Sequence, residues 1–218
     1  MPCRAWEFSE ALSRGFAQLL RRPPSPKELQ AFSRYLSVLI QWNRAHQLTG
    51  YRTPPEITEK LFLDSLLFLR WIEPPARKLL DLGAGAGIPG IPIKIVEPGI
   101  EVTLLEARRR RTSFLATVAR ELELEGVQVR HGRAEELLAS EPTLGGAFDV
   151  VVARAVGPLE SILPLGLAFL APGGRFISSG PPAGKPLPSL PQSISYRWES
   201  IPTLGNAMSR RFLIAEKS

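Results

Sequence analysis

Residues 79–90 read LLDLGAGAGIPG, and this stretch restricts the fold of the chain more than any other. Two leucines lead to Asp81, and Pro89, a residue favoured in the first turn of a helix, comes near the end. The glycines at alternate positions between them are Gly83, Gly85 and Gly87. Glycine lets the backbone turn sharply and lets a ligand approach it closely. The stretch therefore predicts a strand that turns directly into a helix at a ligand site, and residues 85–90 also match the dinucleotide pattern G-x-G-x-x-G.

Short apolar segments alternate with amphipathic ones after this point. The predicted strands are 78–82, 101–106, 127–131, 148–153 and 173–179. The predicted helices are 89–97, 108–124, 133–139 and 158–170. This alternation indicates an α/β fold with a mostly parallel sheet and helices on both faces. Two further strands, at 194–201 and 210–216, are expected to close one edge of the sheet as a hairpin.

The N-terminal third shows helical spacing only. Helices are predicted at 5–22, 26–42 and 55–72. Ser25 is a candidate N-cap and Pro26 falls in the first turn of the second helix. The pair Pro74-Pro75 ends the third helix. We therefore expect a helical unit at residues 1–75 and an α/β unit at residues 76–218.

Composition indicates a basic protein without a membrane span. The chain has 218 residues, 44% of them hydrophobic, and a net charge of +6, which favours polyanionic partners. Cys3 is alone, so an intramolecular disulfide is excluded, and MPCRAWEFSE lacks a signal-peptide pattern; we expect a cytoplasmic protein. No apolar run approaches the roughly 20 residues of a membrane span. Two histidines are too few for a convincing metal site, so no metal is expected.

Two acidic residues discriminate between the cofactors that such a loop binds. In an open α/β sheet, ligands lie at the C-terminal ends of the strands, where Asp81 and Glu106 both fall. Glu106 can accept hydrogen bonds from both ribose hydroxyls, and its charge disfavours a 2′-phosphate, so NADP is not expected. The Asp81 carboxylate would repel the pyrophosphate of NAD but not the amino group and sulfonium of S-adenosylmethionine. S-adenosylmethionine is therefore the expected cofactor, with NAD as the alternative.

Two other segments reach the same edge of the predicted sheet. Arg154 follows the apolar run of the fourth strand, where a role in ligand binding is expected. Ala134 and Glu135 follow the third strand, where a backbone or carboxylate contact to an adenine ring would come from.

Several longer motifs occur together in this chain. They are WNRAHQLTG at 42–50, DSL at 64–66, DLGAGAGIPGIPIKI at 81–95, LLEARRRRTSFL at 104–115, GRAEE at 132–136 and VVARAV at 151–156. With these motifs the chain closely resembles the RsmG/GidB family of ribosomal RNA methyltransferases over nearly its whole length. The resemblance implies a Rossmann-like S-adenosylmethionine-dependent methyltransferase fold at 76–218 with an N-terminal helical cap at 1–75. It also implies methyl transfer to N7 of one guanine in 16S rRNA, near the decoding region of the small ribosomal subunit.

The resemblance also assigns site residues. By motif position, the family's cofactor contacts fall on Gly83, Ile88, Ala134, Glu135 and Arg154, and the physical argument adds Asp81, Gly85 and Glu106. The candidate catalytic residues are Asn43, Asp64 and Arg154. We expect Asn43 and Asp64 to lie over the methyl-donor pocket as part of the target-base wall, with helix capping as the alternative role for Thr49 or Asp64. The expected partner is 16S rRNA or the small subunit, and the protein is expected to be a monomer.

The chain departs from the family pattern at three places. It has Gln47-Leu48-Thr49 where NLT is frequent, Leu61 where a histidine is frequent, and Ser179-Gly180 where Lys-Gly is usual. Lys185, in the following loop, is a candidate to replace the missing cation. These departures concern segments expected near the target base or the RNA, so the cofactor half of the site is the better supported half.

The expected chemistry needs no general base. Guanine N7 already carries an in-plane lone pair, so the enzyme has only to hold N7, the methyl carbon and sulfur in line at about 3–3.5 Å reacting distance. The four arginines that open the predicted helix after Glu106 are placed unfavourably for the helix dipole, and we expect one or more of them to contact rRNA phosphate. They are Arg108, Arg109, Arg110 and Arg111. The alternatives are another RNA or small-molecule methyltransferase, an RNA-binding protein with a vestigial loop, or an NAD-dependent oxidoreductase.

Overall fold

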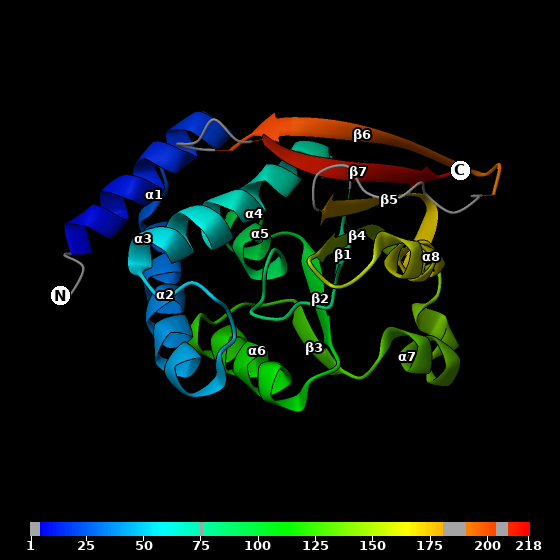
Figure 1. Cartoon of the computed structure of the whole chain (residues 1–218), viewed down its shortest axis with the longest axis horizontal. Coiled ribbons are helices and arrows are strands. Elements are labelled where there is room, and N and C mark those ends of the chain that lie inside the picture. Colours follow the sequence, from blue (N-terminus) through cyan, green and yellow to red (C-terminus); the bar gives the residue numbers. More distant parts are fainter. Residues whose placement is uncertain (1–4, 75, 181–190, 204–208) are drawn as a thin grey trace.

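Seven strands form one sheet with helices on both of its faces (Figure 1). The computed structural model describes residues 5–74, 76–180, 191–203 and 209–218. The strand order is β3-β2-β1-β4-β5-β7-β6, in which β1 to β5 run parallel and β6 and β7 run antiparallel. The predicted α/β fold with a mostly parallel sheet is therefore confirmed, and so is the antiparallel pair at one edge.

The strands match the predicted ranges closely. They are β1 (Lys78–Leu82), β2 (Glu101–Glu106), β3 (Val127–His131), β4 (Phe148–Arg154), β5 (Leu170–Gly180), β6 (Ile194–Pro202) and β7 (Ser209–Lys217). The order reverses between β1 and β4, and in open α/β sheets ligands bind at the C-terminal ends of the strands at such a point. Asp149 lies at the opposite end of β4, where its carboxylate accepts hydrogen bonds from the N–H groups of Arg77 and Lys78 and aligns the start of β1.

The helices also follow the predicted periodicity. They are α1 (Ala5–Leu20), α2 (Pro26–His46), α3 (Pro54–Ile57), η1 (Thr58–Leu63), α4 (Asp64–Leu66), η2 (Leu67–Trp71), α5 (Gly90–Val96), α6 (Arg109–Glu121), α7 (Ala134–Ser140), η3 (Pro142–Leu144) and α8 (Leu159–Phe169). The single helix expected at 55–72 is a continuous helical segment whose winding changes from α to π, back to α and then to 3₁₀. Pro89 was expected inside α5 but precedes it, as the N-cap that follows a cis Ile88–Pro89 peptide.

The N-terminal helices share one hydrophobic core with the sheet. A cluster that runs from Phe8 on α1 to Ile214 on β7 fills the face covered by α1, α2, α5 and α6. A second cluster lies on the other face, under α7 and α8. Figure 1 shows these two helical layers on either side of the sheet. In the part of the chain that the structure describes, no helix is both long and apolar enough to cross a membrane.

The start of α2 has a complete capping box. The Ser25 hydroxyl accepts a hydrogen bond from the N–H of Glu28, and the Glu28 carboxylate accepts one from the N–H of Ser25. Arg22 also pairs with the same carboxylate at 2.6 Å. The predicted Ser25 cap with Pro26 in the first turn is confirmed.

Replacing Ser25 by alanine is expected to lower the free energy of unfolding by about 1 kcal/mol, because one helix N–H loses its acceptor. For a chain of this size, this corresponds to roughly 2–4 °C in Tm. The matched control is Ser33→Ala, the same change at an exposed position inside the same helix. Thermal denaturation of both variants measures the difference, and equal Tm values would show that the cap contributes nothing.

Candidate active site

Alternation along the strands brings three charged side chains to one face of the sheet. Asp81 on β1 lies opposite Leu104 on β2 and opposite Val152 on β4. Glu106 and Arg154 each follow two residues later, and in strands residues two apart point to the same side. Asp81, Glu106 and Arg154 therefore share the face covered by the N-terminal helices, at the C-terminal ends of three neighbouring strands.

The loop after β1 passes between these groups. Gly83, Gly85 and Gly87 have φ values of +73°, +58° and +80°, which side chains with a Cβ rarely adopt. The N–H groups of Gly83 and Ala84 both donate to the carbonyl of Leu105, at 2.9 Å. The loop is therefore tied to the end of β2.

Helix α2 fixes the loop from the other side. The buried hydroxyl of Tyr35 donates a hydrogen bond to the carbonyl of Ala86. The Tyr35 ring stacks on Phe62 of η1, with ring centroids 4.8 Å apart, and burial raises the pKa of Tyr35 well above its usual value. The N-terminal helices thus hold the conformation of the glycine loop.

Glu106 connects the loop to the next strand. One of its carboxylate oxygens accepts from the N–H of Gly85 at 2.9 Å, and the other accepts from the N–H of Arg108 at 2.8 Å. The side chain of Arg111 lies 3.9 Å from the same carboxylate. The contacts orient the carboxylate, and each oxygen retains a lone pair with which to accept a further hydrogen bond.

Asp81 is fully buried and only half satisfied. Its Oδ2 accepts a hydrogen bond from the N–H of Gly90, at the start of α5, at 2.8 Å, whereas its Oδ1 has no partner. Burial raises the pKa of Asp81 to about 7; the Gly90 N–H and the Arg154 charge oppose this rise, and the Glu106 charge adds to it. A buried carboxylate oxygen without a partner is costly, so it marks a place where a donor would be favourable.

Arg154 also has a buried polar atom without a hydrogen-bond partner, in this case a donor. Its Nη2 donates a hydrogen bond to the carbonyl of Lys60 at 2.6 Å and forms an ion pair with Asp64, whose Oδ2 lies 2.8 Å away. Its Nη1 is buried and has no partner. Burial lowers the pKa of Arg154 from its usual value, and the charge of Asp64 opposes this effect. In the described part of the chain, Asp81 Oδ1 and Arg154 Nη1 are the buried side-chain polar atoms without a partner.

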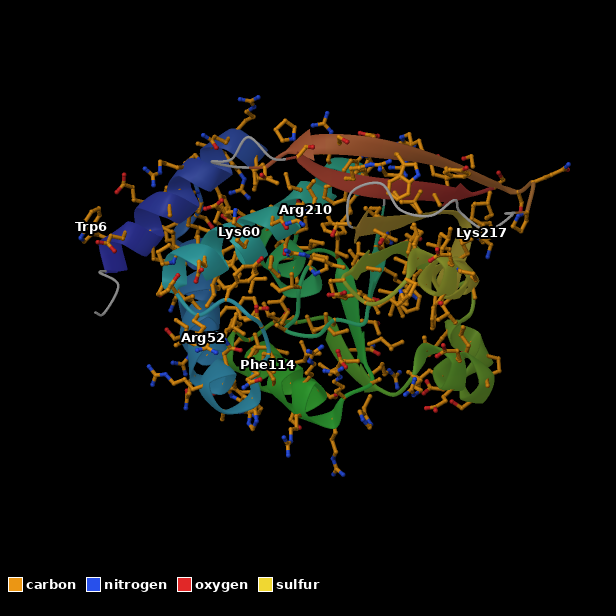
Figure 2. All side chains as sticks on the ribbon, viewed as in Figure 1. Trp6, Arg52, Lys60, Phe114, Arg210 and Lys217 are labelled. Atoms are coloured by element: carbon orange, nitrogen blue, oxygen red, sulfur yellow. The ribbon has the colours of Figure 1, made fainter. Side chains whose placement is uncertain are left out.

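Asp64 binds a second arginine that the sequence analysis did not identify. Arg210, on β7, donates from Nη2 to Asp64 Oδ2 at 2.7 Å and from Nε to Asp64 Oδ1 at 3.3 Å. Figure 2 shows Arg210 where the start of β7 meets the helical segment that also holds Lys60. Arg210 alternates with the buried Phe212 and Ile214, so the period of two was a signal that could have placed it on this face.

Asn43 is engaged in the turn after α2. Its side-chain amide donates to the carbonyl of Tyr51 and accepts from the N–H of Thr49, at 3.0 and 2.9 Å. The Thr49 hydroxyl accepts from the N–H of Tyr51 and stabilises the turn, while Thr53 caps α3; a helix-capping role for Thr49 is therefore wrong. Contact of Asn43 with a target base stays a prediction.

The other predicted site residues occupy three places. Ile88 is buried in the glycine loop, and Ala134 and Glu135 begin α7, directly after β3. Of the four arginines, Arg108 is the N-cap of α6 and the other three lie in its first turn. Arg109 and Arg110 are exposed.

The structure shows where two of the residues that depart from the family pattern lie. Leu61 is buried in η1, where its carbonyl accepts a hydrogen bond from the Ser65 hydroxyl. Ser179 is buried on β5, opposite Arg154 on β4 and Phe212 on β7. Lys185, the candidate replacement cation, lies outside the described residues.

A cavity of about 180 Å³ adjoins the glycine loop on the α8 side of the sheet. Its walls include Ala153, Val156, Pro158, Ile162, Ser178 and Trp198. Val156 lies directly over Gly83, where an added Cβ would come within 2.5 Å of its side chain. No group of three or more metal-ligating side chains occurs among residues 5–74, 76–180, 191–203 and 209–218.

The fold, the glycine loop and the acidic residue at the end of β2 define the S-adenosylmethionine-dependent methyltransferases as the class of this protein. Solved structures share the fold. An O-methyltransferase from Bacillus cereus, in complex with SAH, aligns with a TM-score of 0.62 and 19% identity over 99% of this chain and 100% of that one. A putative O-methyltransferase from Klebsiella pneumoniae aligns with a TM-score of 0.59 and 16% identity over 98% and 99%.

The chain belongs to the family described as rRNA small subunit methyltransferase G, whose model matches residues 28–179. The ribosomal RNA small subunit methyltransferase G of Desulfitobacterium hafniense is 39% identical over 173 residues, which are 79% of this chain and 71% of that protein. The proteins of the same name from Caldanaerobacter subterraneus and Streptococcus pyogenes are 41% and 39% identical over 69% and 71% of this chain. The alignments cover 63% and 65% of these two relatives.

Proposed function

We propose that the protein transfers the methyl group of S-adenosylmethionine to N7 of a guanine in 16S rRNA of the small ribosomal subunit. The observation that carries the proposal is the pair of unpartnered buried atoms, Asp81 Oδ1 and Arg154 Nη1, on one face of the sheet beside Glu106. Membership of the rRNA small subunit methyltransferase G family supports the choice of acceptor.

The residues present fit the methyl donor group by group. The amino acid part of S-adenosylmethionine carries an ammonium and a carboxylate, which complement Asp81 Oδ1 and Arg154 Nη1. Glu106 would accept hydrogen bonds from the ribose hydroxyls, as carboxylates at the end of the second strand do. The remaining proposed contacts are the loop residues Gly83, Gly85 and Ile88, and, towards the adenine ring, Ala134 and Glu135.

In the proposed reaction the protein acts by positioning the methyl donor and the acceptor. Bound S-adenosylmethionine supplies an electrophilic methyl group, and guanine N7 supplies a lone pair without first losing a proton. The chain therefore has to hold the acceptor in line and to keep water out, and no side chain has to remove a proton. Asp64 and Asn43, proposed for the target-base wall, come from the 1–75 segment, which we propose as a helical cap over the 76–218 methyltransferase domain.

The direct test uses labelled S-adenosylmethionine with small subunits, and separately with free 16S rRNA, from a strain that lacks this methyl group. We expect label in at least one of the two substrates. Absence of label from both the small subunits and the free rRNA would contradict the proposal. We further propose that the protein acts as a monomer in the cytoplasm, where its ribosomal substrate lies, and sedimentation of the pure protein tests the monomer.

Cofactor affinity is expected to rise with pH through about 7, the pKa of Asp81. The pKa is raised in the folded state, so the protonated carboxyl prevails below this value and cannot pair with the ammonium of the ligand. Affinity for S-adenosylhomocysteine should fall about tenfold between pH 8 and pH 6. Titration calorimetry measures it, and the Asp81→Asn variant should bind weakly with little pH dependence over this range. A wild-type affinity that does not change with pH would contradict the assignment of Asp81.

Replacing Arg109 and Arg110 together by glutamate is expected to weaken RNA binding and to reduce its dependence on salt. Each lost phosphate contact removes about one unit from the slope of log affinity against log salt concentration. The control is Arg14→Glu with Arg34→Glu, two exposed arginines on α1 and α2. An unchanged slope for the Arg109 and Arg110 variant would overturn their assignment to rRNA.

A further inference from the structure

Three charged side chains from distant parts of the chain, Asp64, Arg154 and Arg210, form one cluster. Asp64 from α4 is 5% exposed, and its Oδ2 lies 2.8 Å from Arg154 Nη2 and 2.7 Å from Arg210 Nη2. Arg210 also reaches Oδ1 through its Nε, so it binds the carboxylate in a fork. The cluster therefore joins the N-terminal helical segment, the end of β4 and the start of the antiparallel strand β7.

The two arginines and the one aspartate of this cluster carry a net charge of +1. Two guanidinium groups share one carboxylate, and the Arg154 Nη1 that remains without a partner is buried. A lone Asp64–Arg154 pair would be neutral and would present little positive potential to a ligand. With Arg210 satisfying Asp64 through two hydrogen bonds, the charge of Arg154 remains available to an anion.

We propose that Arg210 is a positioning residue that makes Arg154 specific for the carboxylate of the methyl donor. This proposal rests on the proposed binding of S-adenosylmethionine at this site. Arg210 acts through Asp64: it neutralises the carboxylate and fixes its orientation, and Asp64 in turn fixes Arg154 together with the Lys60 carbonyl, at 2.6 Å. Arg210 lies beyond residues 28–179, the part of the chain that matches the family model.

The test compares two ligands that differ by one group: S-adenosylhomocysteine and its decarboxylated analogue. The dissociation constant of the analogue divided by that of S-adenosylhomocysteine measures recognition of the carboxylate alone. In the Arg210→Met variant we expect this ratio to fall by about tenfold, through weaker binding of S-adenosylhomocysteine, while the analogue binds as before. In Arg154→Met the ratio should approach one, and Arg210→Lys, which keeps the charge, should retain most of it.

The matched control is Arg211→Met, the next residue on β7, whose guanidinium lies over Trp198 at 4.6 Å. It removes the same charge from the other face of the strand and should leave the ratio unchanged. Equal weakening of both ligands in Arg210→Met would show a merely structural role, and an unchanged ratio would show no role; either result overturns the proposal. If the methionine variant does not fold, Arg210→Gln carries the same prediction. Failure of the wild type to bind S-adenosylhomocysteine would refute the proposed function instead.

Discussion

Replacing Glu106 by alanine is expected to lower the affinity for S-adenosylhomocysteine by about 100-fold or more. Hydrogen bonds to a charged group contribute about 1.5–3 kcal/mol each, and two ribose hydroxyls would lose their acceptor. The substitution also removes the acceptor of the Gly85 N–H, so the loop that should contact the ligand loses an anchor. Titration calorimetry measures the affinity, and thermal denaturation confirms that the variant is folded.

The matched control is Glu101→Ala, which removes the same charge from the exposed beginning of the same strand. It is expected to change the affinity less than twofold, because exposed charges at the far end of a strand are screened by solvent. The variant Glu106→Gln keeps the shape but presents an NH₂ group near the N–H donors of Gly85 or Arg108, so it should also bind poorly. Wild-type affinity in the Glu106→Ala variant would remove Glu106 from the site.

Replacing Gly87 by alanine is expected to lower the free energy of unfolding by about 3 kcal/mol. The left-handed conformation costs an L-residue about 1–2 kcal/mol, and overpacking adds roughly 1–3 kcal/mol. At its φ of +80°, the new Cβ would lie 2.4 Å from Ile91 Cδ1 and 2.9 Å from the Tyr35 hydroxyl. The Tyr35 hydroxyl binds the loop carbonyl of Ala86, so the damage should reach the ligand site as well.

The expected decrease in Tm for Gly87→Ala is about 10 °C. The control is Gly99→Ala, because an added Cβ at Gly99 meets nothing within 4 Å and its φ is not positive. Differential scanning calorimetry of both variants gives the comparison. A Gly87→Ala protein that melts within about 2 °C of the wild type would show that the glycine loop is not constrained as described.

The local patterns predicted the strands well because each strand carries its own signal. Leu79 and Leu80 before Asp81, and the apolar run up to Arg154, mark both the strands and their C-terminal ends. The N-terminal helices were harder to place, since the Tyr35 bond to Ala86 joins segments that no local period connects. Pro89 was predicted one position too far into the helix: it is the N-cap of α5, which begins at Gly90.

The charged cluster at Asp64 shows the limit of reading a sequence for its site. Asp64 was predicted for the target-base wall, which stays a prediction, but its two guanidinium partners were not predicted together. One partner, Arg210, belongs to a strand that pairs antiparallel with β5. Its position depends on the register of that pairing, which the residues around Arg210 do not determine by themselves.

The central claim is methyl transfer to guanine N7, and the most direct measurement is the identity of the modified nucleoside. Small-subunit rRNA from a strain that lacks the modification is incubated with the protein and S-adenosylmethionine, digested to nucleosides and analysed by mass spectrometry against standards. We predict one 7-methylguanosine per rRNA molecule, absent when Arg154→Met replaces the wild type. A methyl group on another base, on another atom of guanine, or on no nucleoside at all would contradict the claim.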